Sequence, residues 1–309
     1  ILDFDTYVYL PLNNKFIKYS AKNSKFSDKK KQKMIDKDLR NLHVDIKDVD
    51  KFYEYSATQL AELSSSANPL SETEKEQKLY SAIRDIFYQV LDENATPDFT
   101  AGKAMLGTCQ KIISNFITQG ESSNWYAQLI RTMSGQTGDY SHASEVSTYA
   151  ALFAIGLQYP NVEDLAIAGM LHDIGLVEIP QDLSDKAELD EDSLTDEEKE
   201  LYFSHIAKGL DIVKRNRMVL QDHVIKAIEQ HHEKWNGKGY PKGKAGNTLS
   251  IEAQILSVAD KFQNLVAEKP GKKRFSPSEA IEEIKNSGAV SNELYGKLRK
   301  LFNVEMSKN

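Results

Sequence analysis

The sequence predicts a mainly α-helical protein in which a helical bundle follows a small α/β unit. Apolar and polar residues alternate near the start of the chain, as in strands, whereas helix caps and helical periodicity dominate the rest. In the second half, histidines and aspartates recur 26 to 33 residues apart, about one helix and a turn at each step. We therefore expect an N-terminal regulatory or interaction region over residues 1–125 and a helical domain over residues 126–309.

The first fifty residues favour a ββαβ unit. Tyr7–Leu12 and Phe16–Ser20 are predicted strands separated by a turn. The Lys-rich stretch Ser27–Asn41 is predicted to be a helix capped by Ser27, and Leu42–Ile46 a short third strand. The lysines of this helix are better explained as a solvated face than as a binding surface.

Caps and breaks then mark the later elements. Residues 49–91 are expected to form connecting helices. Thr195 with Glu198 predicts a capping box for the helix that carries His205. The stretch Asp182–Glu200 is rich in acids and poor in apolar groups, so we predict an exposed loop beside the site.

Composition limits the classes of partner. The 309 residues carry 46 acidic and 39 basic side chains, a net charge of −7, which argues against binding nucleic acid polymers or acidic membranes. The single cysteine, Cys109, fits a reducing compartment. No signal peptide is visible and the longest apolar runs are too short to cross a bilayer, so the expected location is cytoplasmic.

The recurring histidines and aspartates predict a metal centre. Each step of the series would place its residues on a different helix, and all could meet inside one bundle. Asp173 has two oxygens beside a histidine and could bridge two ions, an arrangement that produces a nucleophilic hydroxide at neutral pH. A single His–Asp pair would more often be a satisfied core histidine, so the prediction depends on the whole series. Its members are His142, His172, Asp173, His205, His231, His232 and Asp260.

Two segments of the series resemble a known family. Gly169–Gly175 contains the His–Asp pair after an apolar helix, and His231–Pro241 reads HHEKWNGKGYP. Together and in this order they resemble the HD-GYP subgroup of the HD-domain metallohydrolases, over roughly residues 126–309. The resemblance implies packed helices, a metal centre of two or three ions, and hydrolysis of cyclic di-GMP to pGpG and GMP by a metal-bridging hydroxide.

Carried over position by position, the resemblance makes the seven residues of the series the metal ligands. One division places His142, His172 and Asp260 on one ion. His205, His231 and His232 would then hold the other ion, with Asp173 as the bridging, catalytic carboxylate. Iron is the expected metal, followed by manganese, with zinc also compatible with these ligands.

Further positions concern the substrate and partners. Lys269 and Lys272 occupy the place of the family's basic string and are the expected phosphate contacts, although a solvated basic loop is the simpler alternative. Tyr240 and Asn236 of the GYP loop are further substrate-binding candidates. The implied partners are cyclic di-GMP and diguanylate cyclase (GGDEF) domains. Glu233 is expected to orient a ligand histidine.

The chain also departs from the family's pattern. Leu176 stands where a lysine is usual, and Gln263 stands where an aspartate near that lysine is usual. Glu145 replaces an arginine, and Gly138 replaces the glutamate of three-metal members, so we expect two ions. Because these changes spare the ligands, weak turnover is compatible with a retained centre. The alternative function is a degenerate member that binds cyclic di-GMP or a signalling partner without significant turnover.

Overall fold

The computed structural model describes residues 1–78 and 140–302, apart from short gaps at residues 11–12, 26, 38, 40–41, 65–67, 72, 76–77, 216–217 and 268–272. It divides into two compact units, Ile1–Glu62 and Leu63–Asn309. The predicted domain boundary between residues 125 and 126 lies outside the described residues and stays a prediction. Within the described ranges, no helix combines the length and the apolar character needed to span a membrane.

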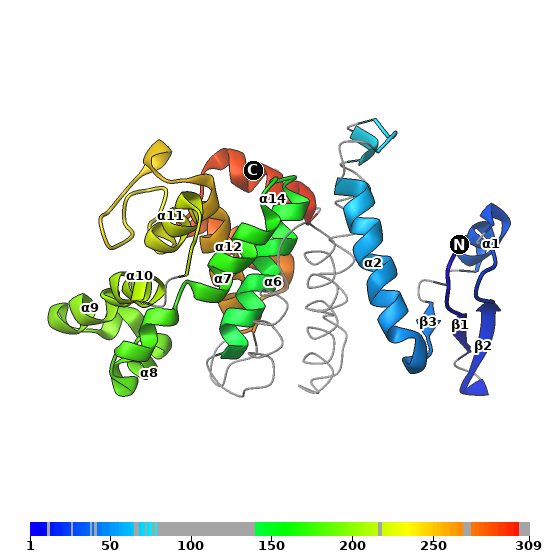
Figure 1. The fold of residues 1–309 in the computed structure, drawn as a ribbon, viewed down its shortest axis with the longest axis horizontal. Helices are drawn as coiled ribbons and strands as arrows, with labels where there is room; N and C mark the ends of the chain where they lie inside the picture. Colours follow the sequence, from blue (N-terminus) through cyan, green and yellow to red (C-terminus); the bar gives the residue numbers. More distant parts are fainter. Residues whose placement is uncertain are drawn as a thin grey trace. The chain divides into compact units, whose positions relative to one another are not determined.

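The smaller unit is the predicted ββαβ arrangement. Strand β1 lies between β2 and β3 and is antiparallel to both (Figure 1). Its elements are β1 (Thr6–Leu10), β2 (Lys15–Ser20), α1 (Asp28–Asp36), β3 (His43–Val44), η2 (Ile46–Asp48) and α2 (Val49–Ser64). The backbone N–H of Lys30 donates to Ser27 Oγ at 3.4 Å, so Ser27 caps α1 as predicted.

Several apolar side chains of this unit are buried. Its buried apolar side chains are Phe4, Val8, Ala57 and Leu60. The ring of Phe4 meets the rings of Phe52 and Tyr55 edge to face, at centroid distances of 6.2 and 5.9 Å. The start of the chain is therefore held against α2 by aromatic packing.

The larger unit is helical throughout its described residues, as the sequence predicts. Its elements are α6 (Tyr140–Gly156), α7 (Val162–Leu171), η3 (Ile174–Glu178), α8 (Gln181–Asp190), η4 (Glu191–Ser193), α9 (Asp196–Phe203), α10 (His205–Arg215), α11 (Asp222–Gln230), η5 (Gly246–Thr248), α12 (Ile251–Val266), α13 (Pro277–Asn286) and α14 (Asn292–Leu301).

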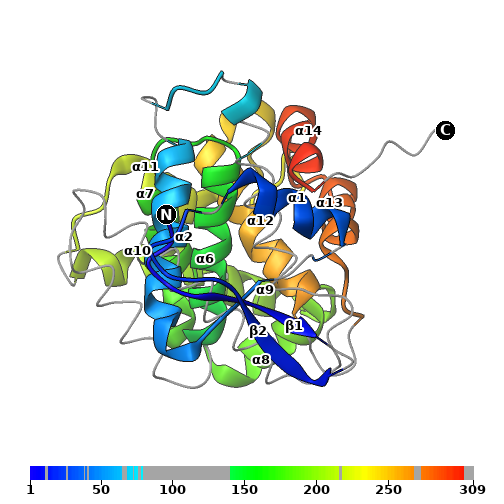
Figure 2. The same cartoon turned by 90° about the vertical axis from the view of Figure 1, so that its right-hand side faces the viewer.

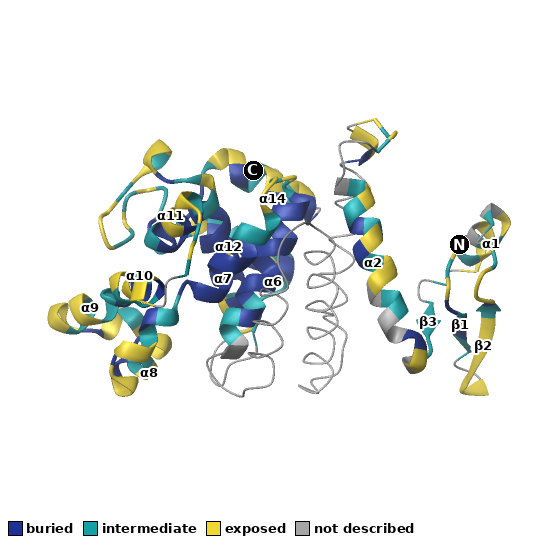
Figure 3. Ribbon diagram, viewed as in Figure 1, coloured by how far each residue is buried: buried dark blue, intermediate teal, exposed yellow. Residues whose placement is uncertain are grey.

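Helices α6, α7 and α12 form the centre of this unit. They contact one another, and α11 packs against α7 and α12. Figure 3 shows the central helices as mostly buried, and α13 packs between α12 and α14, on one side of the bundle in Figure 2. The fully buried Phe262 ring of α12 meets Phe153 of α6 and Phe302 after α14, at centroid distances of 5.3 and 5.7 Å. Burying each such ring contributes about 1.5–3 kcal/mol and fixes α6 beside α12.

The acidic stretch Asp182–Glu200 corrects a prediction. It forms α8, η4 and α9 rather than a loop. The reason is a small apolar cluster of Ile179, Leu183, Ala187 and Leu194, which lies on one side of these elements while most of the acids are exposed. The capping box of Thr195 and Glu198 is present, but it begins α9, and His205 starts the next helix, α10.

A glycine allows η3 to lie directly on α10. A Cβ added at Gly175 would stand 1.9 Å from the carbonyl oxygen of His205 and 2.5 Å from the backbone nitrogen of Gly209. Backbone atoms cannot yield as a flexible side chain can, so only glycine fits. This close approach sets the segment after the His–Asp pair against the start of the helix that carries His205.

Candidate metal centre

The helices of the larger unit bring all seven residues of the series to one place. His142 lies in the first turn of α6, and His172 and Asp173 directly follow α7. His205 is the first residue of α10. His231 and His232 directly follow α11, and Asp260 lies in α12.

The carboxylate of Asp173 lies between two sets of imidazoles. Its Oδ2 atom is 3.1 Å from His172 Nε2 and 3.9 Å from His142 Nε2. Its Oδ1 atom is 3.4 Å from His205 Nε2 and 3.5 Å from His231 Nε2. The two oxygens thus face different histidines, which is the arrangement required of a bridging ligand.

Two overlapping groups could hold metal ions. One contains Asp173, His205, His231 and His232, and the other contains His142, His172 and Asp173, with the ligand atoms of each group within 4.8 Å of one another. Asp260 adjoins the second group, since its Oδ1 is 3.4 Å from His142 Nε2 and 4.0 Å from His172 Nε2. Asn264 Nδ2 donates to the same oxygen at 2.9 Å and steadies it.

The unpaired atoms of the cluster fit a metal. Buried polar groups are normally hydrogen-bonded because leaving them unpaired costs about 1–3 kcal/mol each. Five buried atoms here have no hydrogen-bond partner: His172 Nε2, Asp173 Oδ1, His205 Nε2, His231 Nε2 and His232 Nε2. All five point into the cluster, and a nitrogen–oxygen donor set of this kind matches borderline divalent ions.

Backbone carbonyls set the orientation of three of these rings. The Nδ1 atoms of His172, His205 and His231 lie 2.9, 2.7 and 2.7 Å from the carbonyl oxygens of the residues three positions earlier. A carbonyl only accepts, so each Nδ1 carries the proton. When such a ring is neutral, it presents the lone pair of Nε2 to the centre, as a metal ligand must.

Charge and burial strongly perturb the cluster. Burial alone would raise the pKa values of Asp173 and Asp260, but the neighbouring imidazoles outweigh burial and hold both below their usual range. Burial alone would lower the pKa of His172, but Asp173 and Asp260 raise it to about 9. For His231 and His232 burial prevails, and their pKa values are lowered. Groups so perturbed are typical of functional sites.

The first histidine is oriented by side chains. His142 Nδ1 lies 2.8 Å from Gln263 Oε1, and Gln263 Nε2 donates to Glu145 Oε2 at 2.7 Å. From the sequence, Gln263 was expected to be related to position 176, and nothing predicted its contact with Glu145. Both residues are departures from the family pattern, and that shared property was the only sequence signal that could have joined them.

Leu176 packs against apolar side chains. It is a partly buried member of the apolar cluster around Leu183 and Leu194. Leu176 therefore packs against α8 and provides no positive charge at the position where a lysine is usual in the family. Lys261, next to Asp260 on α12, is a half-buried cation near the centre that the sequence analysis did not single out, and burial lowers the pKa of its ammonium group.

The GYP loop is tied to the centre through Tyr240. Its ring stacks on Phe203 at a centroid distance of 3.6 Å and on His232 at 4.5 Å. Its hydroxyl donates to Glu191 Oε2 at 3.4 Å. Burial, with the nearby Glu191 charge, raises the pKa of the Tyr240 phenol. Neither Glu191 nor Phe203 carried a motif that would have marked it.

The other predicted residues have different surroundings. Asn236 accepts from the backbone of Lys238 at 3.0 Å and donates to the Ser287 carbonyl at 3.4 Å, so it shapes the turn. Glu233 accepts from the backbone of Lys242 and Lys244 at 2.7 and 2.9 Å. Glu233 therefore holds the loop, and the prediction that it orients a ligand histidine is wrong. Lys269 and Lys272 lie outside the described residues.

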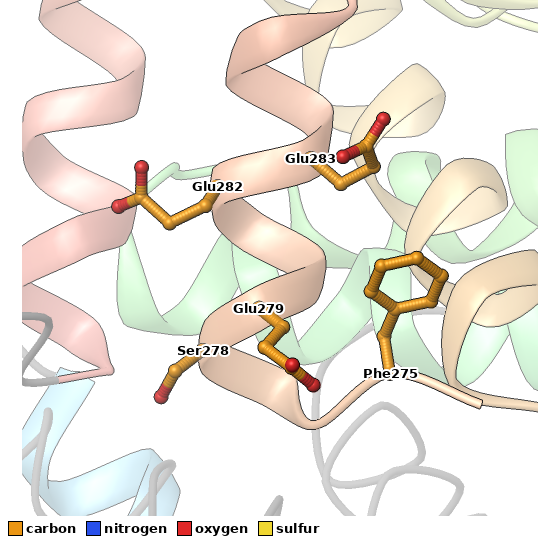
Figure 4. Close-up of a pocket in the computed structure, with 5 residues that line it drawn as sticks. All are labelled: Phe275, Ser278, Glu279, Glu282 and Glu283. Carbon is orange, nitrogen blue, oxygen red and sulfur yellow. The ribbon is translucent and has the colours of Figure 1, made fainter. Parts of the chain in front are cut away.

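A surface pocket elsewhere does not suit a phosphate ligand. Its volume is about 370 Å³ and it shares no residue with the metal cluster. Figure 4 shows Glu279, Glu282 and Glu283 of α13 around it, with Phe275 at one side. Three carboxylates would repel an anion, so the metal cluster is the candidate site.

Known proteins share this region of the chain. Residues 131–290 match the family model of the HD domain. A "Cyclic di-GMP phosphodiesterase" of Thermotoga maritima is 29% identical over 198 residues, which is 62% of this chain and 52% of the relative. A "3'3'-cGAMP-specific phosphodiesterase 2" of Vibrio cholerae is 29% identical over 160 residues, 51% of this chain and 30% of the relative. The chain thus spans about half of the first relative's length and less of the second's.

One solved structure is also similar. Bd1817, a HDG"Y"P protein from Bdellovibrio bacteriovorus, aligns over 98% of this chain and 95% of its own with a TM-score of 0.43 and 20% identity.

Proposed function

This chain belongs to the HD-domain family, which confirms the resemblance found in its sequence, and from that premise we propose that it is a metal-dependent phosphodiesterase. The proposed substrate is cyclic di-GMP, hydrolysed to pGpG and GMP. Relatives named for cyclic di-GMP and for 3'3'-cGAMP support a cyclic dinucleotide as the substrate class.

The observation that carries the proposal is the placement of Asp173. Its two oxygens face two groups of imidazoles whose Nε2 atoms are buried and unpaired. Two ions on these groups, with Asp173 as the shared carboxylate, would satisfy those atoms. The ligand set is compatible with iron, manganese and zinc. We propose iron at both positions, with manganese as the second choice and zinc as the third.

The chemistry divides between the ions and the chain. When bound, a pair of divalent ions neutralises phosphodiester charge and supplies a water-derived nucleophile at neutral pH. The chain holds its ligands rigidly, because the imidazoles are fixed by hydrogen bonds before substrate arrives. Access comes from the side of His142 and Asp173, whose side chains keep 27% and 19% of their surface exposed.

Four residues are proposed for the substrate itself. Lys269 and Lys272 would contact the phosphates, and Tyr240 and Asn236 of the GYP loop would border the nucleotide. For Asn236 the support is indirect, because it orders the loop through the Lys238 backbone. For Tyr240 the support is its stack on His232, which places it at the edge of the centre.

The test is hydrolysis by the intact protein loaded with Fe²⁺ or with Mn²⁺. Cyclic di-GMP and 3'3'-cGAMP are incubated separately, and linear products are separated by chromatography. Product formation that a chelator abolishes, with two ions per chain by elemental analysis, is the expected result. No linear product from cyclic di-GMP with either metal would contradict the proposed activity.

The apolar packing of Leu176 favours a second candidate function. Without a cation at that position, transition-state stabilisation falls by several kcal/mol if no other group replaces it, hence by orders of magnitude in rate. The protein would then bind cyclic di-GMP, or a diguanylate cyclase domain, without significant turnover. Calorimetric titration beside the activity assay separates the two, since tight binding without product identifies the sensor.

A further inference from the structure

Gln263 of α12 connects two side chains of α6 that lie three residues apart in the sequence. It extends from α12 between His142 and Glu145, both on α6, and it is only 5% exposed. Its Oε1 lies 2.8 Å from His142 Nδ1, and its Nε2 donates to Glu145 Oε2 at 2.7 Å. The three side chains therefore form one hydrogen-bonded row that ends at the metal cluster.

The chemistry of the row leaves one arrangement of protons. An ionised Glu145 only accepts, so it requires the amide nitrogen of Gln263 to face it. The carbonyl oxygen of Gln263 must then face His142, where it can only accept the proton of Nδ1. The lone pair of His142 is thereby placed on Nε2, 3.4 Å from Asp260 and 3.9 Å from Asp173.

We propose that Gln263 and Glu145 are positioning residues that set the affinity of one ion, the ion held by His142, His172 and Asp260. This inference rests on the proposed metal centre, and it concerns the affinity of only one of the two metal positions. His205 and His231, of the other position, take their orientation from backbone carbonyls that no side-chain substitution removes. Partners beyond the ligands change metal affinity by about 10- to 100-fold in known sites.

The sharpest variant is Gln263→Leu, which keeps the volume and removes both hydrogen bonds. Glu145→Gln is the conservative variant, since its side-chain oxygen can still accept from Gln263 while the charge is lost. Gln254→Leu is the matched control. Gln254 is a 6% exposed glutamine of the same helix whose Oε1 accepts from the Ser291 backbone at 3.2 Å, away from the cluster.

The first measurement is titration of the metal-free full chain with Zn²⁺ against a competing chelator, which gives a dissociation constant for each ion. In Gln263→Leu we expect one constant to weaken about 10- to 100-fold while the other is unchanged. Glu145→Gln should weaken the same constant less. Gln254→Leu should change neither, even where it lowers the melting temperature.

The second measurement does not need a metal. In ¹⁵N-histidine NMR of the metal-free protein, the Nδ1–H of His142 should give a slowly exchanging resonance, assigned by its loss in His142→Ala. It should persist in Gln254→Leu and Glu145→Gln and disappear in Gln263→Leu. A resonance that survives in Gln263→Leu would overturn the row.

The outcomes separate the two proposals. If the unaltered chain takes up no Zn²⁺, Fe²⁺ or Mn²⁺, the proposed function fails, and the assignment to an ion fails with it. If the unaltered chain binds two ions and Gln263→Leu binds both equally well, or loses both equally, only the positioning role is overturned.

Discussion

At the scale of single residues, one carboxylate connects both halves of the centre. Asp173 Oδ1 and Oδ2 face different histidine groups, at 3.4 and 3.1 Å from the nearest Nε2 atoms. Removing one negative charge there withdraws a ligand from two positions at once. Asp173 is therefore the residue whose substitution should have the broadest effect on metal binding.

Asp173→Asn should reduce bound metal at both positions and lower phosphodiesterase activity by about 100-fold or more, because an amide neutralises no cation charge. Elemental analysis and product assays measure this. Asp164→Asn is the matched control: Asp164 pairs with His223 at 2.7 Å outside the cluster. Equal metal content in Asp173→Asn and the unaltered chain would refute the bridging role.

Protons should compete with the metal at the same atoms. In the metal-free protein the pKa of His172 is raised to about 9 by Asp173 and Asp260, so this ring carries a proton at neutral pH. A protonated Nε2 cannot be a ligand, so metal binding must release that proton. The apparent affinity should rise as pH increases toward about 9 and fall in acid. Calorimetry in buffers of different ionisation enthalpy should show proton release, and its absence at pH 7 would contradict this.

At the scale of elements, the contact of η3 with α10 determines where two of the proposed ligands lie. Asp173 precedes η3 and His205 begins α10, and Gly175 lies directly against the His205 backbone. The relative position of these two residues thus depends on a backbone contact that leaves no room for a side chain at position 175. Glycine is therefore required there.

Gly175→Ala should destabilise the protein by about 1–3 kcal/mol and weaken metal binding, since the added Cβ forces η3 away from α10. Urea denaturation with and without metal measures both effects. Gly296→Ala is the control: a Cβ at Gly296, within α14, would meet nothing within 4 Å. It should be neutral or stabilising by up to about 1 kcal/mol. Similar losses in both variants would refute the steric explanation.

The elements differ in how far the sequence predicted them. The strands, the cap of α1 and the ligand-bearing helices were predictable because alternation, caps and spacing are local signals. The α8–α9 region was not, because its many acids obscured four apolar residues that pack together. The link of Gln263 to Glu145 was also hidden, since it joins residues 118 positions apart and depends on how α12 lies against α6.

At the scale of the whole molecule, the proposed metal ligands belong to only one of the two units. All seven lie within Leu63–Asn309, whereas Ile1–Glu62 contains the small sheet and its own buried Phe4 and Leu60. Two compact units of one chain can unfold in separate transitions. Metal binding should therefore stabilise one unit only.

Differential scanning calorimetry of the full chain should show two unfolding transitions. Metal should raise the midpoint temperature of only one of them, the transition of the larger unit. The ligands come from five separate parts of the bundle, so ions bound to the folded state alone stabilise all of it. A chelator should lower that midpoint temperature and leave the midpoint of the smaller unit unchanged. One transition that moves as a whole would show that the two units unfold together.

The ring of Tyr240 lies against His232 on one side and Phe203 on the other. An ion captured by His232 would change the electric field across that phenol ring. The tyrosine is thus a natural optical probe: its near-ultraviolet difference spectrum should follow filling of the site in real time, without any attached dye.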